Sequence, residues 1–205
     1  MKYLDTHHVM RFLVQVLITA VGTAIIAVGM TLMRKENLGM DAFTALSVGL
    51  SHHLPIGLGN IQLGDYLILL VIVLFMDYHQ IGFGTLINMM VGYGVQYFTL
   101  WFGAYLVFTS FWLKLLFAVL GFLIFTVGIA VYMSAKFGVS SYDAIAPIFS
   151  KKFHMPYWSV RVIQDVLFMF LAFLASGPIG IMTIIISLCS GPFVEFWGRH
   201  LNLIQ

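Results

Sequence analysis

Six apolar stretches, each about as long as a helix that crosses a lipid bilayer, constrain this chain more than any other feature. They lie near residues 11–33, 58–76, 83–101, 112–134, 157–175 and 179–197. A crossing helix needs about 20 consecutive, mostly apolar residues. Backbone groups inside the hydrocarbon must be satisfied within their own segment, so stretches of this kind form helices. The sequence therefore predicts a single all-α transmembrane domain over residues 1–205, a polytopic helical bundle with six spans.

The composition agrees with a membrane protein and excludes other classes. Only 9% of the residues are charged and 61% are hydrophobic, whereas a soluble domain carries about 25% charged residues. The net charge of +2 is too small and too scattered for a nucleic-acid partner. The first apolar stretch lacks a small-x-small cleavage site, so we interpret it as a retained helix and not as a signal peptide.

Two further segments, 41–53 and 140–152, are moderately apolar but too short to cross the bilayer. Each follows a span, and the sequence predicts a half-helix that is either re-entrant or interfacial. Asp41 and Asp143 stand near the two expected helix starts. For Asp41 we favour an N-cap facing the helix dipole. For Asp143 a cap and a position in a binding cavity are equally plausible.

The basic residues orient the predicted spans. Loops on the cytoplasmic side carry an excess of lysine and arginine. With the N-terminus inside, six basic residues lie at inner helix ends and three at outer ends: Lys2, Arg11, Lys136, Lys151, Lys152 and Arg199 against Arg34, Lys35 and Lys114. The sequence predicts a multi-pass protein of the bacterial cytoplasmic membrane, with both termini in the cytoplasm.

The chain also repeats itself at a spacing of 99 residues. This shift brings several glycines and polar residues into register: Gly22 with Gly121, Gly29 with Gly128, Gly39 with Gly138, Gly92 with Gly191, Gln62 with Arg161, and Asp65 with Gln164. Each copy, 11–101 and 112–198, holds three spans and one half-helix. Because the number of spans is odd, the second copy would be upside down, as in many secondary transporters.

Polar residues interrupt the starts of two spans in corresponding places. Gln62 and Asp65 open one span, and Arg161, Gln164 and Asp165 open its counterpart. A charge at membrane depth costs roughly 2.5–3.5 kcal/mol on insertion scales, so it is rare without a partner or a cavity. Arg161 and Asp165 are four residues apart and can pair on one helix face. Asp65 and Asp165 each lie about 12 Å deep at about 1.5 Å per residue, so an inverted repeat would place them close together.

This polar cluster supports two interpretations. It is either a central substrate site, in which Arg161 binds an anionic group and a carboxylate binds a proton or cation, or a structural ion pair with amides joining the helices. We favour the site. The candidate substrate-binding residues are Gln62, Asp65, Asp143, Arg161, Gln164, Asp165 and Tyr93. Proton coupling through Asp65 or Asp165 is a further hypothesis.

Glycines and one proline occur within several predicted spans. Residues 91–94, which include Tyr93, and residues 190–193 indicate either broken helices beside a substrate path or kinks and close-packing points. Gly22 and Gly29 form a small-residue stripe, repeated as Gly121 and Gly128, that could serve a homodimer or pack within one protomer. Gln96 and Glu195, near the ends of their spans, are expected at the membrane interface.

The sequence contains no motif that favours an enzyme, a metal site or a cofactor. The histidine pairs 7–8 and 52–53 have no third ligand spaced nearby, and we interpret them as solvated loop residues. A glycine-rich phosphate loop, a nucleophile elbow and a metalloprotease motif are absent from the sequence. We therefore expect no catalytic residues, no cofactor and no bound metal.

The order of these features resembles the YczE/YyaS/YitT family of bacterial integral membrane proteins. The residues that carry the resemblance are 39–51, 57–65 and 82–94, with their copies 138–150, 158–165 and 180–192. They form a span ending in glycine, a short helix, a span with an early acid, then Gly-x-x-Thr and a glycine-containing span. The resemblance covers nearly the whole chain and implies architecture, without catalytic residues.

We expect a small secondary transporter or exporter of a polar or ionic small molecule, with its site at the bilayer midplane between the second and fifth spans. Two alternatives remain open. One is the substrate-binding membrane subunit of an energy-coupled importer, which also has six spans and would present small residues such as Ala20 and Ala24 to a partner. The other is a non-transporting membrane scaffold or assembly factor. The expected partners are the lipid bilayer and the solute.

Overall fold

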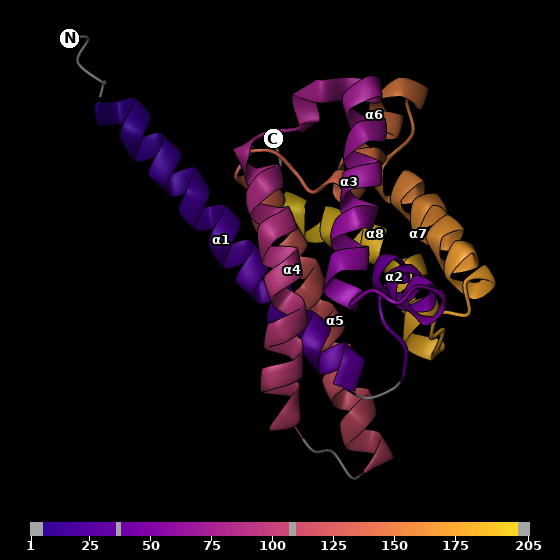
Figure 1. Ribbon diagram of the computed structural model, residues 1–205. Coiled ribbons are helices and arrows are strands. Elements are labelled where there is room, and N and C mark those ends of the chain that lie inside the picture. Colours follow the sequence, from indigo (N-terminus) through magenta and orange to yellow (C-terminus); the bar gives the residue numbers. More distant parts are fainter. Residues whose placement is uncertain (1–5, 36–37, 107–109, 201–205) are drawn as a thin grey trace.

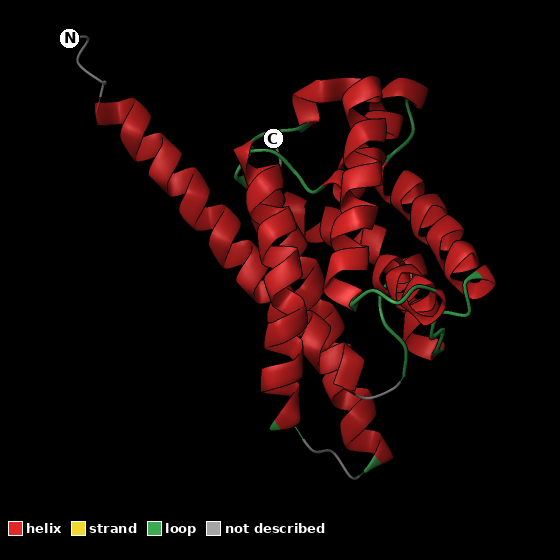
Figure 2. Ribbon diagram, in the orientation of Figure 1, coloured by secondary structure: helices red, strands yellow, loops and turns green. Residues whose placement is uncertain are grey.

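The computed structural model describes residues 6–35, 38–106 and 110–200, and these form helices joined by short connections (Figures 1 and 2). No strand occurs in these ranges, so the all-α prediction is confirmed. The elements are α1 (Thr6–Lys35), α2 (Ala42–His53), α3 (Leu58–Asp77), the 3-10 turn η1 (Tyr78–Gln80), α4 (Phe83–Ala104), α5 (Phe111–Ser134), α6 (Ser141–Phe153), α7 (Tyr157–Leu174) and α8 (Ile181–His200).

The helices that could cross a membrane are longer than the short helices α2 and α6. Within the described ranges, five helices are long and apolar enough to span a bilayer: α1, α3 with its 3-10 extension, α5, α7 and α8. The chain is therefore a multi-pass membrane protein. The predicted span 83–101 falls on α4, which is not among the five. The count of six spans therefore stays a prediction. The two short helices, α2 and α6, occupy the predicted half-helix segments.

Loops at equivalent places in the two halves make equivalent bonds to the opposite half. The amide of Gly84 donates to the carbonyl of Phe137 (2.7 Å), and 98 residues later the amide of Met182 donates to the carbonyl of Leu38 (3.0 Å), 99 residues before Phe137. Gly39 and Gly138 follow these two carbonyls with φ angles of 114° and 103°. Side chains other than glycine rarely adopt such angles, which explains why glycine recurs at both positions.

Helices α1 and α5 pack along each other through the glycine stripe. A Cβ atom added to Gly22 would lie 2.6 Å from the backbone of Tyr132, and one added to Gly29 would lie 2.6 Å from the backbone of Phe125. Positions that advance along α1 thus meet positions that recede along α5, so the two helices are antiparallel. The stripe is used within the protomer. A homodimer stays a prediction and would need another surface.

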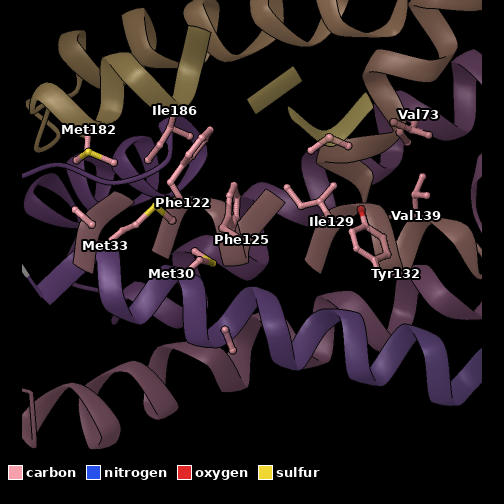
Figure 3. Close-up of a cluster of buried hydrophobic side chains, with 14 of the residues drawn as sticks. Met30, Met33, Val73, Phe122, Phe125, Ile129, Tyr132, Val139, Met182 and Ile186 are labelled. Atoms are coloured by element: carbon pink, nitrogen blue, oxygen red, sulfur yellow. The ribbon is translucent and has the colours of Figure 1, made fainter. Parts of the chain in front are cut away.

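The core lies where α1, α5 and α8 meet. Met30, Phe122, Phe125, Ile129 and Ile186 belong to one buried apolar cluster in this region (Figure 3). In contrast, the outward faces of α3, α5 and α7 carry large exposed apolar side chains, including Ile68, Leu116 and Phe170. A helix that is apolar on its outer face as well as its inner face is typical of a membrane bundle.

Helices α4 and α8 run without interruption through their glycine segments, so the interpretation of these spans as broken helices is wrong. Gly191 instead allows a close approach between helices, because an added Cβ would lie 2.6 Å from the carbonyl oxygen of Trp158 in α7. Pro192 is accommodated inside α8. The close-packing interpretation therefore applies to this part of α8.

Candidate binding site between the two halves

The first turns of the two short helices line one internal cavity. The side chain of Asp41 caps α2 by accepting a hydrogen bond from the Thr44 amide (2.9 Å), which confirms the predicted N-cap. At the corresponding place in α6, the Ser140 hydroxyl accepts a hydrogen bond from the Asp143 amide (3.1 Å). Each cap satisfies an amide at the start of its helix. Both helices therefore begin beside the cavity.

The cavity has a volume of about 70 Å³ and corresponding residues of the two halves line it. Seven pairs of positions 99 residues apart contribute: Ile26 and Phe125, Met30 and Ile129, Asp41 and Ser140, Phe43 and Tyr142, Thr44 and Asp143, Gln62 and Arg161, and Tyr66 and Asp165. A single water needs at least ~10–15 Å³ of such space. The cavity therefore has room for several waters or for one small solute between the two halves of the chain.

Arg161 is the centre of an ionic network on one side of this cavity. Arg161 is only 3% exposed. One terminal nitrogen donates to Asp143, and its Nε lies 3.3 Å from Oδ1 of Asp165, the partner that the four-residue spacing predicts. The guanidinium also lies over the ring of Tyr142, 4.8 Å from its centre. Arg161 is thus already paired with two carboxylates.

Hydroxyl groups complete the coordination of both carboxylates. Asp143 accepts hydrogen bonds from Tyr132 and from Ser140 (2.7 Å). Asp165 accepts hydrogen bonds from the hydroxyls of Tyr142 and Ser190. The network therefore connects α5, α6, α7 and α8. Because buried charges are tolerated when they are paired and hydrogen-bonded, this arrangement fixes the second half of the chain around Arg161.

The first half presents a different surface to the same cavity. Thr44, Gln62 and Tyr66 stand where the second half has its three charges, and none of them is ionic. Two buried polar atoms on this side, Oδ2 of Asp41 and Nδ2 of Asn88, have no hydrogen-bond partner among the described residues. A buried polar group without a partner costs roughly 1–3 kcal/mol. Both residues line the cavity, and both belong to the first half of the chain.

Three predicted site residues do not line the cavity. Asp65 accepts a hydrogen bond from Ser47 of α2 (2.6 Å), and Gln164 donates to the carbonyl of Tyr142 in α6 (2.8 Å). These two residues are 99 apart and occupy equivalent helix faces. The next residues, Tyr66 and Asp165, reach the cavity instead, because each step along a helix turns the side chain by about 100°.

The third of these residues, Tyr93, and the predicted interfacial residues Gln96 and Glu195 belong to the spans with glycines. The hydroxyl of Tyr93 lies 3.1 Å from that of Tyr97 on the same helix, away from the cavity. Glu195 accepts a hydrogen bond from the amide of Trp158 (3.1 Å) and pairs with the exposed Arg199. The interfacial position of Glu195 stays a prediction. The side chain of Gln96 lies outside the described residues.

Comparisons with known proteins show which family this chain belongs to. The family described as being of unknown function, DUF6198, matches residues 13–199. The chain belongs to this family. The match to DUF6198 spans all the helices that build the cavity. The chain is also similar to a protein of Bacillus subtilis (strain 168) named Uncharacterized protein YyaS, with 26% identity over 172 residues, 83% of this chain and 85% of that protein. No solved structure matches.

The similarity to YyaS is in keeping with the resemblance seen in the sequence. The broader YczE/YyaS/YitT grouping stays a prediction for this DUF6198 member. Neither the family description nor the name of the relative states an activity. The function of the cavity must therefore be argued from its own residues.

Several residues of the site could not be singled out from the sequence. Asn88 is one amide in a long apolar stretch, where helix–helix contact is the ordinary interpretation. Tyr66 and Tyr142 resemble the many other aromatic residues of the chain. Ser190 was noticed only as part of a glycine-proline segment. The repeat offered one usable signal, since Asn88 falls on Ser187 and Tyr66 falls on Asp165 at a shift of 99 residues.

Replacing Ser190 with alanine is expected to destabilise the protein by about 1.5–3 kcal/mol, because a buried carboxylate loses a hydrogen bond. The measurement is reversible unfolding in mixed detergent micelles. Ser187→Ala, one turn earlier in α8, is the matched control. Its hydroxyl is fully buried and has no partner among the described residues, so its loss should be neutral or stabilising. Equal losses in the two variants would contradict the role of Ser190.

Proposed function

We propose that this protein is a secondary transporter that carries a small polar solute through the cavity between its two halves. The observation that supports the proposal best is the cavity itself, which equivalent positions of both halves line and in which buried polar atoms lack partners. Polar and ionisable groups inside a membrane protein are expensive and usually mark a solute path. A purely structural interface would have no need of unsatisfied groups around a void.

Inverted repeats are the second part of the proposal. The antiparallel packing of α1 on α5 and the reciprocal loop bonds support two halves of opposite orientation. In transporters built this way, the substrate site lies near the bilayer midplane between the repeats, beside the ends of short or interrupted helices. The starts of α2 and α6 would be these ends. Rocking one half against the other would then expose the cavity to the two sides in turn.

A larger hollow of about 640 Å³ lies elsewhere on the protein and would provide an entry on one side. Lys136, Lys151 and Arg199 line it together with Tyr157. Arg161, one helical turn beyond Tyr157, lines the central cavity. The basic residues favour the cytoplasmic face, and we propose that both termini lie inside the cell in a bacterial cytoplasmic membrane. We propose that the hollow is the inner vestibule and that Tyr157 stands between it and the site.

We also propose proton coupling, and Asp165 is a better candidate for carrying the proton than Asp65. Asp165 lines the cavity, whereas Asp65 faces Ser47 of α2. A proton carried on Asp165 would break its charge interaction with Arg161, which offers a direct link between protonation and helix movement. Asp65→Asn is accordingly expected to leave any proton dependence of transport in place.

The proposal is tested by blocking the cavity. Ala42 is 2% exposed and lines it, so Ala42→Met should fill part of the space. Proteoliposomes are loaded with a mixed panel of small amines, amides, sugars and carboxylates, and efflux is followed by mass spectrometry. We expect at least one solute to leave these proteoliposomes faster than it leaves vesicles without protein. In Ala42→Met its efflux should be roughly tenfold slower, because a misfit of about 1–3 kcal/mol opposes binding.

Ala20→Met, on the exposed face of α1, is the control for the added side chain. Its efflux should equal that of the parent protein. Correct folding of both variants is checked by monodisperse elution and by reversible thermal unfolding. If a folded, inserted parent protein moves no member of the panel, or if Ala42→Met moves them at the parent rate, the proposed transport path is wrong.

A further inference from the structure

The cavity has one unused acceptor and one unused donor on the same side. Asp41 uses Oδ1 to cap α2, and its buried Oδ2 has no partner among the described residues. Asn88 is 7% exposed, and its Oδ1 lies 3.4 Å from the hydroxyl of Thr23, while its buried Nδ2 has no partner in the same described ranges. A solute that satisfies both must donate a hydrogen bond to Asp41 and accept one from Asn88.

The charges around the cavity favour a cation. Three lining residues are carboxylates, namely Asp41, Asp143 and Asp165, and the lining contains one guanidinium, that of Arg161. Arg161 serves Asp143 and Asp165 together. Arg34, at the end of α1, is near enough to interact with the charge of Asp41 but does not line the cavity. An additional negative solute would therefore meet excess negative charge on the walls.

Aromatic side chains cover the wall beside Asp41. The ring centre of Phe43 lies 4.7 Å from that of Tyr66 and 4.9 Å from that of Tyr142, and all three residues line the cavity. Aromatic faces attract ammonium groups through the ring quadrupole. Tyr142 already receives the guanidinium of Arg161 in this manner. Phe43 and Tyr66 add two further aromatic rings to the lining that includes Asp41.

We propose that the cavity binds a small protonated amine that also carries a hydrogen-bond acceptor, with its ammonium group on Oδ2 of Asp41 and its acceptor on the amide of Asn88. This inference rests on the proposed transport function and names its substrate class. A bare metal ion fits the walls less well. Among the described residues no group of three or more histidine, cysteine or acidic side chains could hold one.

The binding test uses the full chain in detergent and follows thermal unfolding by tryptophan fluorescence. Ethanolammonium chloride is the main probe, since it combines an ammonium group with a hydroxyl acceptor. Ethylammonium lacks the acceptor, ethylene glycol lacks the charge, and sodium and potassium chloride at equal ionic strength supply other monovalent cations. We expect saturable stabilisation by ethanolammonium, about 3- to 10-fold weaker binding of ethylammonium because one hydrogen bond is missing, and no specific effect of the others.

Two variants assign the contacts. Asp41→Asn should weaken ethanolammonium binding at least tenfold, because a hydrogen bond to a charged group is lost. Asparagine still caps a helix, so the variant is expected to fold. Asn88→Ala should bind ethanolammonium and ethylammonium equally. Asp65→Asn is the matched control, since it removes a carboxylate that lies outside the cavity lining, and its binding should be unchanged.

The outcomes separate this inference from the transport proposal. Binding that Asp41→Asn abolishes and Asp65→Asn retains supports the amine site, even if reconstituted vesicles move no solute. The amine site is wrong if no amine stabilises a protein whose vesicles transport an uncharged or anionic solute in an Ala42-dependent manner. It is equally wrong if sodium or potassium ions stabilise the protein more than ethanolammonium does, or if Asp41→Asn binds the amine as the parent does.

Discussion

Arg161→Gln is expected to lower the free energy of unfolding by about 3–5 kcal/mol, the loss that follows when one partner of a buried ion pair is removed. The reason is specific to the site. Asp143 and Asp165 both depend on this guanidinium, and both are buried. Without it, two buried carboxylates would lie close together with hydroxyl groups as their donors and no positive charge beside them. The measurement is reversible unfolding in mixed micelles of a mild detergent and dodecyl sulfate.

The controls for Arg161 separate its charge from its size. Arg199→Gln removes an arginine whose side chain is 74% exposed and paired with Glu195, and exposed pairs contribute about 0–1 kcal/mol. The triple variant Arg161→Gln, Asp143→Asn, Asp165→Asn removes all three charges and should recover part of the loss. If Arg161→Gln were as stable as Arg199→Gln, the ionic network would not hold the second half together.

The helical architecture was predictable because the length of each apolar stretch in the sequence indicates whether its helix can cross a bilayer. Five predicted spans coincide with helices of spanning length, and both short segments form short helices. The glycines before those short helices were informative because a positive φ angle leaves few alternatives to glycine. The helix ends were less predictable. The first helix begins at Thr6 and ends at Lys35, several residues beyond the apolar stretch 11–33, since polar residues at helix ends extend beyond the hydrocarbon.

The site was predictable only in part, because sequence spacing specifies neighbours on one helix and not between helices. The Arg161–Asp165 pair follows from a four-residue spacing. The second partner, Asp143, comes from another helix, and no local pattern connects the two. Asp65 has the same depth as Asp165 in its span but points toward α2. Depth arithmetic ignores rotation about the helix axis, which decides which of two adjacent residues reaches the cavity.

The two halves differ in chemistry although their positions correspond. In the second half the charged groups pair with one another, because Arg161 binds both Asp143 and Asp165. The first half has Thr44, Gln62 and Tyr66 at the matching positions and leaves Asp41 with a spare oxygen. If the two halves are copies of one repeat, they have diverged into a fixed side and an unsatisfied side. A solute of the proposed kind would then be recognised mainly by the first half.

Gly29→Ala is expected to destabilise the protein by about 1–3 kcal/mol, the usual cost of overpacking a tight interface. The added Cβ would lie 2.6 Å from the amide nitrogen of Phe125 and 2.7 Å from the carbonyl oxygen of Gly121. Backbone atoms cannot turn aside, so α1 and α5 would have to separate. This loss opposes the higher helix propensity of alanine, worth about 1 kcal/mol. The same unfolding assay in mixed micelles measures the net change.

Gly64→Ala in α3 is the matched control, because an added Cβ there meets no atom within 4 Å. It should raise stability by up to about 1 kcal/mol, so the two substitutions should act in opposite directions. Gly128 extends the test, since it corresponds to Gly29 and its added Cβ would lie 2.8 Å from the amide of Ile26. If α1 and α5 cross as equivalent members of two repeats, Gly128→Ala must cost about as much as Gly29→Ala. A large loss in one and none in the other would show that the glycine stripe is not a shared seam.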